Sequence, residues 1–510
     1  MLLMQDNTQF VPVENPNMQE KRTKAATISL SERLGTYNEI ETTYSKDEAE
    51  NEADRCLKCP THWCQKMCPA GVPVTDFIAA LRAGNPEEAY RLIRTASAFP
   101  EFCSRVCPKE RQCQSNCTRS INSEAVSISR LERFVTETHY ASGNGEPATP
   151  PTNLPEAGDH RGAECAPSKK SGKKVAVIGS GPSGLAAAQF LTDYGHSVTV
   201  YEKDDRPGGL LEYGIPNMKL EKGVVARKID SLKNQGVEFV LNTAVGKDVS
   251  PEELKGSFDA VVLAVGTRNA RMISAENMAD AKGVYTAVEY LTQTTKTLLD
   301  GGDMAGRSIS AAGKNVVIVG GGDTGNDCVG TAIRDGALSV TQIEMLPKHR
   351  KTFEVETPRM DPLPDEPHST SQEEAKVKFS EDPHVYETTV KAVEKDASGN
   401  VAAVTVIDLE ARYDAYRVSM SEVPGTERTI PCDMLLIAAG FTGPEKAVTE
   451  AFGVSVNERT NIIVGGSVPY MTDVDKVFAC GDCHTGQSLV CRTMTDAREC
   501  AKAVHGYLSE

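Results

Sequence analysis

A strand, a glycine fingerprint and a helix follow one another at two places in this chain, and this repeated unit restricts the fold more than any other feature. The glycines are Gly179, Gly181 and Gly184 in the first copy, and Gly320, Gly322 and Gly325 in the second. The first glycine of such a fingerprint allows a tight turn, the second lets the backbone approach a pyrophosphate, and the third allows close helix–strand packing. The chain therefore predicts two dinucleotide sites, each at the amino end of a helix.

An acidic residue follows each fingerprint, at the end of the next expected strand. Glu202 and Glu344 take these positions. A carboxylate there accepts hydrogen bonds from ribose hydroxyls and favours a free 2′-hydroxyl over a 2′-phosphate. Two such sites imply two cofactors, or one cofactor and one dinucleotide substrate.

Eight of the 15 cysteines lie in one short segment, residues 56–117. They are Cys56, Cys59, Cys64 and Cys68, followed by Cys103, Cys107, Cys113 and Cys117. Thiolates this close need a cation, and the odd number of cysteines in so long a chain argues against a disulfide scaffold. Zinc would take four thiolates in a closed tetrahedron, whereas iron–sulfur clusters would take four ligands each and add electron transfer. The spacing alone leaves both metals open.

The charge balance excludes several classes of partner. The chain has 510 residues, with 55 Lys and Arg against 71 Asp and Glu, and its net charge of −16 repels phosphate backbones and anionic lipid headgroups. No stretch approaches the roughly 18 apolar residues of a membrane span. Residues 1–16 lack the basic end and apolar stretch of a signal peptide. We therefore expect a cytoplasmic protein with no nucleic-acid or membrane partner.

The segment 472–482 ends an apolar strand in Gly481-Asp482. In this motif the sequence resembles the flavoprotein oxidoreductases with two dinucleotide domains, in which this Asp approaches the ribityl and pyrophosphate region of FAD. The resemblance implies FAD at the first fingerprint and NADH or NADPH at the second, in a domain inserted into the FAD domain. Glu344 then favours NADH. A 2′-phosphate could still be reached by Lys348, Arg350 or Arg334.

Longer segments carry a more specific resemblance. CLKCPTHWCQKMCPAGVPVTDFI, FPEFCSRVCPKERQCQSNC and ISRLERF look like the N-terminal domain shared by the glutamate synthase small subunit and pyrimidine dehydrogenase. Segments that begin at Gly208, Gly320, Ala438 and Gly486 look like the glutamate synthase small subunit, and the length fits that subunit too.

This family resemblance implies two 4Fe–4S clusters. The first would be held by Cys56, Cys59, Cys64 and Cys117, and the second by Cys68, Cys107, Cys113 and the carboxylate of Glu132. Glu124 is a less favoured alternative for Glu132, and Cys103 is expected to be a bystander.

The same resemblance implies the residues around the nucleotides. FAD would contact Gly179, Gly181, Gly184, Glu202, Gly209, Leu210, Gly481, Asp482, Gln487, Ser488 and Leu489. NAD(P)H would contact Gly320, Gly322, Asp323, Thr324, Gly325 and Glu344.

The expected fold class is α/β, with a mostly helical iron–sulfur domain followed by two Rossmann-like domains. The iron–sulfur domain would cover residues 1–140 and a linker rich in Gly and Pro residues 141–172. The FAD domain would cover 173–285 and 431–510, with the NAD(P)H domain between them at 286–430. We also expect one helix around 76–94, a strand at 434–438 in the returning FAD domain, and a long surface excursion over 350–385.

These features predict the subunit through which electrons enter glutamate synthase. NAD(P)H would reduce FAD, and the two clusters would pass single electrons to a large subunit that makes glutamate from glutamine and 2-oxoglutarate. No side chain is nominated as a catalytic acid or base. Two alternatives are kept: a stand-alone NAD(P)H-dependent oxidoreductase that feeds ferredoxin or another acceptor, and a zinc-bearing flavoprotein sensor.

The remaining cysteines carry weaker signals. Cys480 and Cys483 flank Gly481-Asp482 as C-x-x-C, which is typical of a redox dithiol, but the positions need only small residues and we favour that interpretation. Packing or surface thiols are expected at Cys165, Cys328, Cys432, Cys491 and Cys500. The segment after Gly266 departs from the Pro-rich family pattern, so no contacts are predicted for Thr267 and Arg268.

Overall fold

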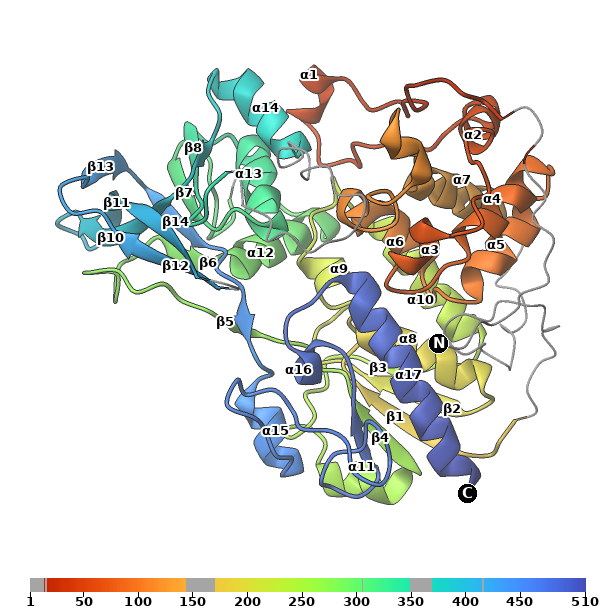
Figure 1. Ribbon diagram of the computed structural model, residues 1–510. Coiled ribbons are helices and arrows are strands. Elements are labelled where there is room, and N and C mark those ends of the chain that lie inside the picture. The colour runs from red at the N-terminus through yellow and green to blue at the C-terminus, as the bar shows by residue number, and fades with distance from the viewer. Residues whose placement is uncertain (1–12, 14–15, 144–169, 305, 349–368, 415–416) are drawn as a thin grey trace.

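The computed structural model describes the chain except for residues 1–12, 14–15, 144–169, 305, 349–368 and 415–416. It consists of a helical N-terminal domain and two parallel-sheet domains, and one long C-terminal helix lies between the N-terminal domain and the first parallel-sheet domain (Figure 1). Most of the expected linker, together with Cys165 and Arg350, lies outside the described residues.

The N-terminal domain is built from short helices around a common apolar core. They are α1 (Leu30–Arg33), α2 (Lys46–Ala53), α3 (Trp63–Lys66), α4 (Val74–Arg82), α5 (Pro86–Arg94), α6 (Pro100–Val106) and α7 (Ile128–Ala141), with 3-10 turns at Lys109–Arg111 and Thr118–Ile121. The single helix expected around 76–94 is wrong, because α4 ends at Arg82 and Gly84 follows in the left-handed region at φ +75°. Pro86 instead starts α5, where the Asn85 side chain accepts a hydrogen bond from the Glu88 N–H at 3.1 Å.

The first parallel sheet has the strand order β16-β4-β1-β2-β3. Its strands are β1 (Lys174–Ile178), β2 (Ser197–Tyr201), β3 (Glu238–Val240), β4 (Ala260–Leu263) and β16 (Val477–Ala479). Its helices are α8 (Pro182–Asp193), α9 (Leu210–Tyr213), α10 (Lys222–Asn234), α11 (Pro251–Ser257), α15 (Lys446–Phe452), α16 (Asp482–Thr485) and α17 (Val490–Ser509). The central strands β1 and β4 are continuous apolar runs because helices cover both faces of the sheet.

The second parallel sheet has the order β6-β14-β7-β8-β9. Its strands are β6 (Val284–Thr286), β7 (Asn315–Val319), β8 (Ser339–Ile343), β9 (His384–Val385) and β14 (Met434–Ile437), with helices α12 (Ala287–Leu299), α13 (Asp323–Asp335) and α14 (Thr370–Phe379). An antiparallel sheet is attached, formed by β10 (Thr388–Lys395), β11 (Val401–Asp414), β12 (Arg417–Glu422) and β13 (Arg428–Pro431). We expected a long surface excursion over residues 350–385. That expectation is wrong for residues 370–379, because they form helix α14.

The strand at 434–438 does not belong to the returning first domain, as we expected. β14 pairs in parallel with β7 and with β6, and its four buried residues complete the second sheet. The chain leaves the first domain through β5 (Asn269–Ala270) and comes back through β15 (Phe441–Thr442), and these two strands pair with each other. The chain rejoins the first sheet only at β16 (Figure 1).

Helix α17 fixes the N-terminal domain to the first parallel-sheet domain. The guanidinium of Arg498 donates to the carbonyl oxygens of Ala70 at 3.1 Å and Ala96 at 2.9 Å, both in the N-terminal domain. The hydroxyl of Thr495 donates to the Pro69 carbonyl at 3.3 Å. The other side of the helix packs on α8 (Figure 1). One helix therefore has the N-terminal domain on one side and the first parallel-sheet domain on the other.

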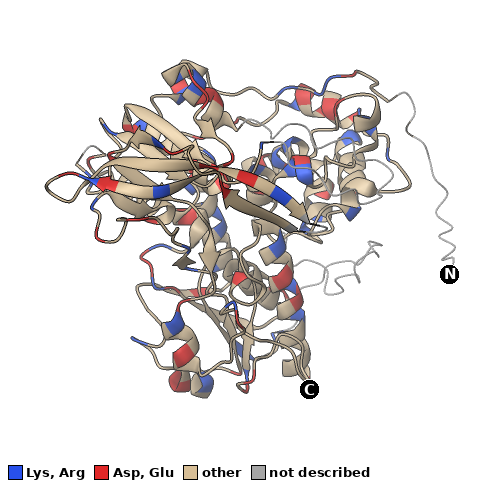
Figure 2. Cartoon of the chain, turned by 60° about the vertical axis from the view of Figure 1, so that its left-hand side comes forward, with Lys and Arg blue, Asp and Glu red and all other residues tan. Residues whose placement is uncertain are grey.

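Charged residues of both signs occur throughout the described part of the chain. Acidic and basic residues are interspersed along the elements of all three domains (Figure 2). Among the described residues, no helix has the length and apolar character needed to cross a membrane.

Candidate functional site

A cavity of about 360 Å³ opens at the carboxyl ends of the strands of the first sheet. The first fingerprint, the loop after β3 and the start of α17 meet around it. Seven of the residues predicted to contact FAD line this cavity: Gly179, Gly181, Glu202, Gly209, Leu210, Asp482 and Ser488. Ligands of open α/β sheets bind in this crevice, so the cavity has the position expected for a dinucleotide.

The glycines of the first fingerprint leave room for a pyrophosphate. A Cβ on Gly181 would meet nothing within 4 Å, so this backbone presents an open surface beside the cavity. A Cβ on Gly184 would collide with the carbonyl oxygen of Gly179, so only glycine lets α8 pack this closely on β1. Gly181 caps α8, whose first N–H groups have no partner within the helix. These groups are suited to binding an anion.

Glu202 is held rigidly at the end of β2. One carboxylate oxygen accepts from the Ser180 N–H at 2.9 Å, and the other accepts from the Asp204 N–H at 2.9 Å. The side chain is buried, and it lines the cavity wall. A carboxylate fixed in this place is suited to accepting hydrogen bonds from the hydroxyls of a ribose.

The other side of the cavity is formed by the motif before α17. The Ser488 hydroxyl donates to Asp482 at 2.7 Å, and burial raises the pKa of Asp482. The Gly481 N–H donates to Asp496 on α17 at 2.6 Å, which fixes the motif to the helix. Ser488 and Val490 bring the amino end of α17 into the cavity wall. The partial positive charge at that helix end stabilises negative charge on a bound ligand.

The lining of the cavity differs in part from the residues predicted to contact FAD. Gly184, Gly481, Gln487 and Leu489 are not part of its wall. Gln487 accepts a hydrogen bond from the Phe441 N–H at 2.8 Å, and so connects this motif to β15. The loop 243–247 lines the cavity, as do Thr267 and Arg268. Nothing in the sequence marked this loop, because it reaches the cavity only through the place of β3 in the sheet.

The second fingerprint repeats the same geometry. Gly320 has φ +129°, and a Cβ there would collide with the Ala438 carbonyl. Glu344, at the end of β8, accepts from the Gly321 N–H at 3.1 Å and from the Leu346 N–H at 2.8 Å. The six predicted NAD(P)H residues, Gly320, Gly322, Asp323, Thr324, Gly325 and Glu344, gather here at the amino end of α13.

One of the three cations considered for a 2′-phosphate is excluded. Arg334 has a fully buried side chain, which is paired with Glu374 at 2.7 Å and donates to the Thr36 carbonyl at 2.7 Å. It therefore cannot reach the fingerprint, and that expectation was wrong. Lys348 is exposed on the loop after β8, with its ammonium 6.0 Å from the centre of the Tyr386 ring.

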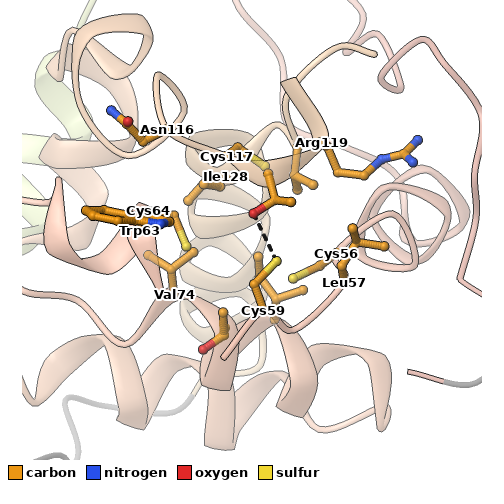
Figure 3. Close-up of a pocket in the computed structure, with 14 residues that line it drawn as sticks. Cys56, Leu57, Cys59, Trp63, Cys64, Val74, Asn116, Cys117, Arg119 and Ile128 are labelled. Carbon is orange, nitrogen blue, oxygen red and sulfur yellow. Dashed lines mark hydrogen bonds between the residues drawn. The ribbon is translucent and has the colours of Figure 1, made fainter. Parts of the chain in front are cut away.

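The first thiol cavity lies within the N-terminal domain and is lined by all four cysteines of the first predicted cluster: Cys56, Cys59, Cys64 and Cys117 (Figure 3). The sulfur of Cys59 lies 3.2 Å from the Thr118 hydroxyl. In the part of the chain that the structure describes, no three donor groups already converge on a single metal ion. The thiols instead surround a space, as the ligands of a multi-atom cluster do.

Burial favours the neutral thiol form of Cys56, Cys64 and Cys68. It raises the pKa of Cys56 to about 11 and the pKa of Cys64 to about 12. Burial also raises the pKa of Cys68, in the second group, to about 12. A cation has to stabilise the thiolates if these residues are to become ligands. The chemistry of the donor set therefore fits iron–sulfur clusters.

The second thiol cavity brings together the four donors predicted for the second cluster: Cys68, Cys107, Cys113 and Glu132. Burial raises the pKa of Glu132 to about 8, and the nearby Cys491 and Glu101 side chains add to the rise. Glu124, the alternative, lies elsewhere, with a half-exposed side chain near Arg22. Only Glu132 of the two candidates lines either cavity.

Two cysteines given minor roles also line this second cavity. Cys103, expected to be a bystander, is close because α6 places it one turn before Cys107. Cys491, expected to be a packing thiol, comes from α17 and accepts a hydrogen bond from the Gln112 side chain at 3.3 Å. No local pattern could have revealed Cys491, since it reaches the cavity only through the docking of two domains.

Cys480 and Cys483 do not line the flavin cavity. Both are fully buried, and the Cys483 thiol donates to the Leu263 carbonyl at 3.3 Å. Every cysteine in the described part of the chain is a free thiol. This arrangement agrees with the interpretation that the two positions only need small residues.

The first turn of α17 separates the flavin cavity from the second thiol cavity. Val490 and Thr493 line the flavin cavity, whereas Cys491 lines the thiol cavity. Successive residues of a helix point about 100° apart, which allows one turn to contribute to both walls. The second thiol cavity therefore lies next to the flavin cavity, while the first is lined only by residues of the N-terminal domain.

Comparison with family profiles agrees with this division of the chain. Residues 33–144 match the profile described as dihydropyrimidine dehydrogenase domain II, 4Fe-4S cluster, and residues 173–501 match pyridine nucleotide-disulphide oxidoreductase. The fold and its sites define an NAD(P)H-dependent FAD and iron–sulfur oxidoreductase. The zinc alternative is therefore wrong.

Individual relatives narrow this class. The chain is 38% identical to the glutamate synthase [NADPH] small chain of Bacillus subtilis, over 96% of this chain and 97% of that one. It is 37% identical to part of the glutamate synthase [NADH] of Schizosaccharomyces pombe, over 92% of this chain and 22% of that protein. FprA of Mycobacterium tuberculosis in complex with NADPH shares the fold, with TM-score 0.52 and 16% identity over 66% of this chain and 85% of that one. The chain belongs to the glutamate synthase small-chain family. Its role is to take in electrons from NAD(P)H for glutamate synthase.

Proposed function

We propose that electrons pass from NAD(P)H at the second fingerprint to FAD in the 360 Å³ cavity, then through the second thiol cavity to the first. Bound FAD supplies the chemistry that splits a hydride pair into single electrons for iron–sulfur clusters. The chain contributes the binding surfaces: two fingerprints, Glu202 and Glu344, and two sets of four donors. The observation that carries this order is the first turn of α17, which lines both the flavin cavity and the second thiol cavity.

We propose the ligand sets Cys56, Cys59, Cys64 and Cys117 for one 4Fe–4S cluster, and Cys68, Cys107, Cys113 and Glu132 for the other. Support comes from the way that each set lines its own cavity. Anaerobically purified protein should then contain about eight iron and eight sulfide per chain. A yellow, iron-free protein would contradict the proposal.

We propose a glutamate synthase large subunit as the electron acceptor, in the cytoplasm. The match to only 22% of the Schizosaccharomyces pombe protein supports a partner, because the rest of that longer chain has room for other domains. We place the exit at the first thiol cavity, whose lining residue Trp63 is 40% exposed. Glutamate formation that needs both subunits supports this role. Fast reduction of ferredoxin by the chain alone, with no glutamate formed after the large subunit is added, would instead support a stand-alone oxidoreductase.

We propose NADH as the preferred substrate, because Glu344 is fixed at the strand end where a 2′-phosphate would lie. The relatives include proteins named for NADPH and for NADH, so the family does not decide the question. The test compares kcat/KM for the two nucleotides in the wild type and in Glu344→Gln. We expect NADH to be preferred, and the substitution to move the ratio toward NADPH by about tenfold, or about 1.4 kcal/mol. A wild-type preference for NADPH would overturn the assignment.

A further inference from the structure

Two other thiols lie beside Cys107 in the second thiol cavity. They belong to Cys103 and Cys491, and both line the cavity without belonging to the proposed ligand set. Cys103 is a neighbour for local reasons, because it lies one helical turn before Cys107. Cys491 is a neighbour only because the flavin domain presses α17 against the N-terminal domain.

The hydrogen bond that the Cys491 sulfur accepts leaves its own S–H group available as a donor. The Gln112 side chain donates to the Cys491 sulfur at 3.3 Å, and both residues are buried. This sulfur is therefore already an acceptor. Cys107 carries no proton once it binds iron as a thiolate. A hydrogen bond between Cys491 and iron-bound Cys107, which line the same cavity, then has to be donated by Cys491.

Glu132 differs from Cys491 in having no such partners. Among the residues that the structure describes, no group hydrogen-bonds the Glu132 carboxylate, although it lines the same cavity. A buried carboxylate without a partner is costly, and iron would remove that cost. Because Cys491 is already satisfied by protein groups, Glu132 suits the role of fourth ligand and Cys491 the role of a hydrogen-bond donor.

We propose that Cys491 donates an S–H···S hydrogen bond to iron-bound Cys107 and thereby raises the reduction potential of the second cluster. The physical reason is that a hydrogen bond to a ligand sulfur stabilises the extra negative charge of the reduced cluster. Cys491 is thus a positioning and tuning residue on the helix that also lines the flavin cavity. The inference rests on the proposed ligand role of Cys107.

The test is a redox titration of the full-length, anaerobically purified holoprotein, followed by electron paramagnetic resonance. The second cluster's signal is identified as the one that Cys68→Ala removes. Cys491→Ala and Cys491→Val both abolish the donor, and the valine also preserves most of the side-chain volume. Cys491→Ser retains a hydroxyl donor. Cys500→Ala is the matched control, because Cys500 is a fully buried cysteine of the same helix that lines neither thiol cavity.

We expect Cys491→Ala and Cys491→Val to shift the midpoint of the second cluster to lower potential, with that of the first cluster and the iron content unchanged. Cys491→Ser and Cys500→Ala should stay near the wild-type midpoint. An unchanged midpoint in both the alanine and valine variants would overturn the inference. The inference would also be overturned if Cys491→Ser lost about four irons while Glu132→Ala kept all its iron. Cys491, and not Glu132, would then be the fourth ligand. Iron-free wild-type protein would refute the proposed function itself, which is a distinguishable result.

Discussion

The two thiol cavities differ in the parts of the chain that build them. The first is lined by one domain only, with cysteines from residues 56–64 and from Cys117. The second takes its proposed donors from the same domain, but Cys491 closes it from the flavin domain. The wall of the first cavity is therefore complete within one domain, whereas the wall of the second is complete only when the two domains are docked. This difference predicts that the two clusters respond to different substitutions.

The largest expected effect is the separate loss of each cluster. Cys68→Ala should remove about four irons from the second cavity, and Cys56→Ala about four from the first, because each substitution takes one of four ligands. FAD should stay bound in both variants, since neither residue lines its cavity. Iron, sulfide and flavin analysis measures this. Loss of all iron in either variant would mean that the cavities are not independent.

Glu132 gives the next effect, on stability and its pH dependence. Its pKa of about 8 in the iron-free fold lies above the ordinary carboxyl value of 4.5, so the fold favours the protonated form. Its contribution is therefore present below about pH 4.5 and lost as pH rises to about 8, at up to about 1.4 kcal/mol per pH unit. Urea unfolding of iron-free protein should show this loss in the wild type. The loss should be smaller in Glu132→Gln, with the exposed Glu124→Gln as control.

Arg498 tests the docking on which the second cavity depends. Arg498→Met removes two hydrogen bonds from a charged donor to the N-terminal domain, and should cost about 1–3 kcal/mol of unfolding free energy. Reduction of the second cluster after flavin reduction should also slow, because α17 is less firmly held. Urea unfolding and anaerobic stopped-flow absorbance measure the two effects. Lys502→Met, an exposed site on the same helix, is the control and should leave both near wild type.

The smallest effect is confined to the first cavity. The Thr118 hydroxyl lies 3.2 Å from the Cys59 sulfur and can donate to it once Cys59 is a thiolate. Thr118→Val should lower the midpoint of the first cluster only, by the loss of one hydrogen bond of about 1 kcal/mol. A shift of the second cluster instead would reverse our assignment of the cavities.

The sequence predicted what local spacing determines. The fingerprints, their acidic partners and the cysteine block all lie in short segments, and each segment folds into one loop or one turn. The strand at β14 and the helices on either side of Pro86 were misjudged, because periodicity reveals an apolar run but neither its sheet nor a break within it. Cys491 and the loop 243–247 could not be predicted, since tertiary docking alone brings them to their cavities.

The order of the electron carriers is tested most directly by rapid-freeze electron paramagnetic resonance after mixing with NADH or NADPH. The comparison is between the wild type and Cys68→Ala, with flavin reduction followed in parallel by absorbance. Both clusters of the wild type should become reduced. In Cys68→Ala the flavin should be reduced while the first cluster stays oxidised on the turnover time scale. Reduction of that first cluster at the wild-type rate would contradict the account.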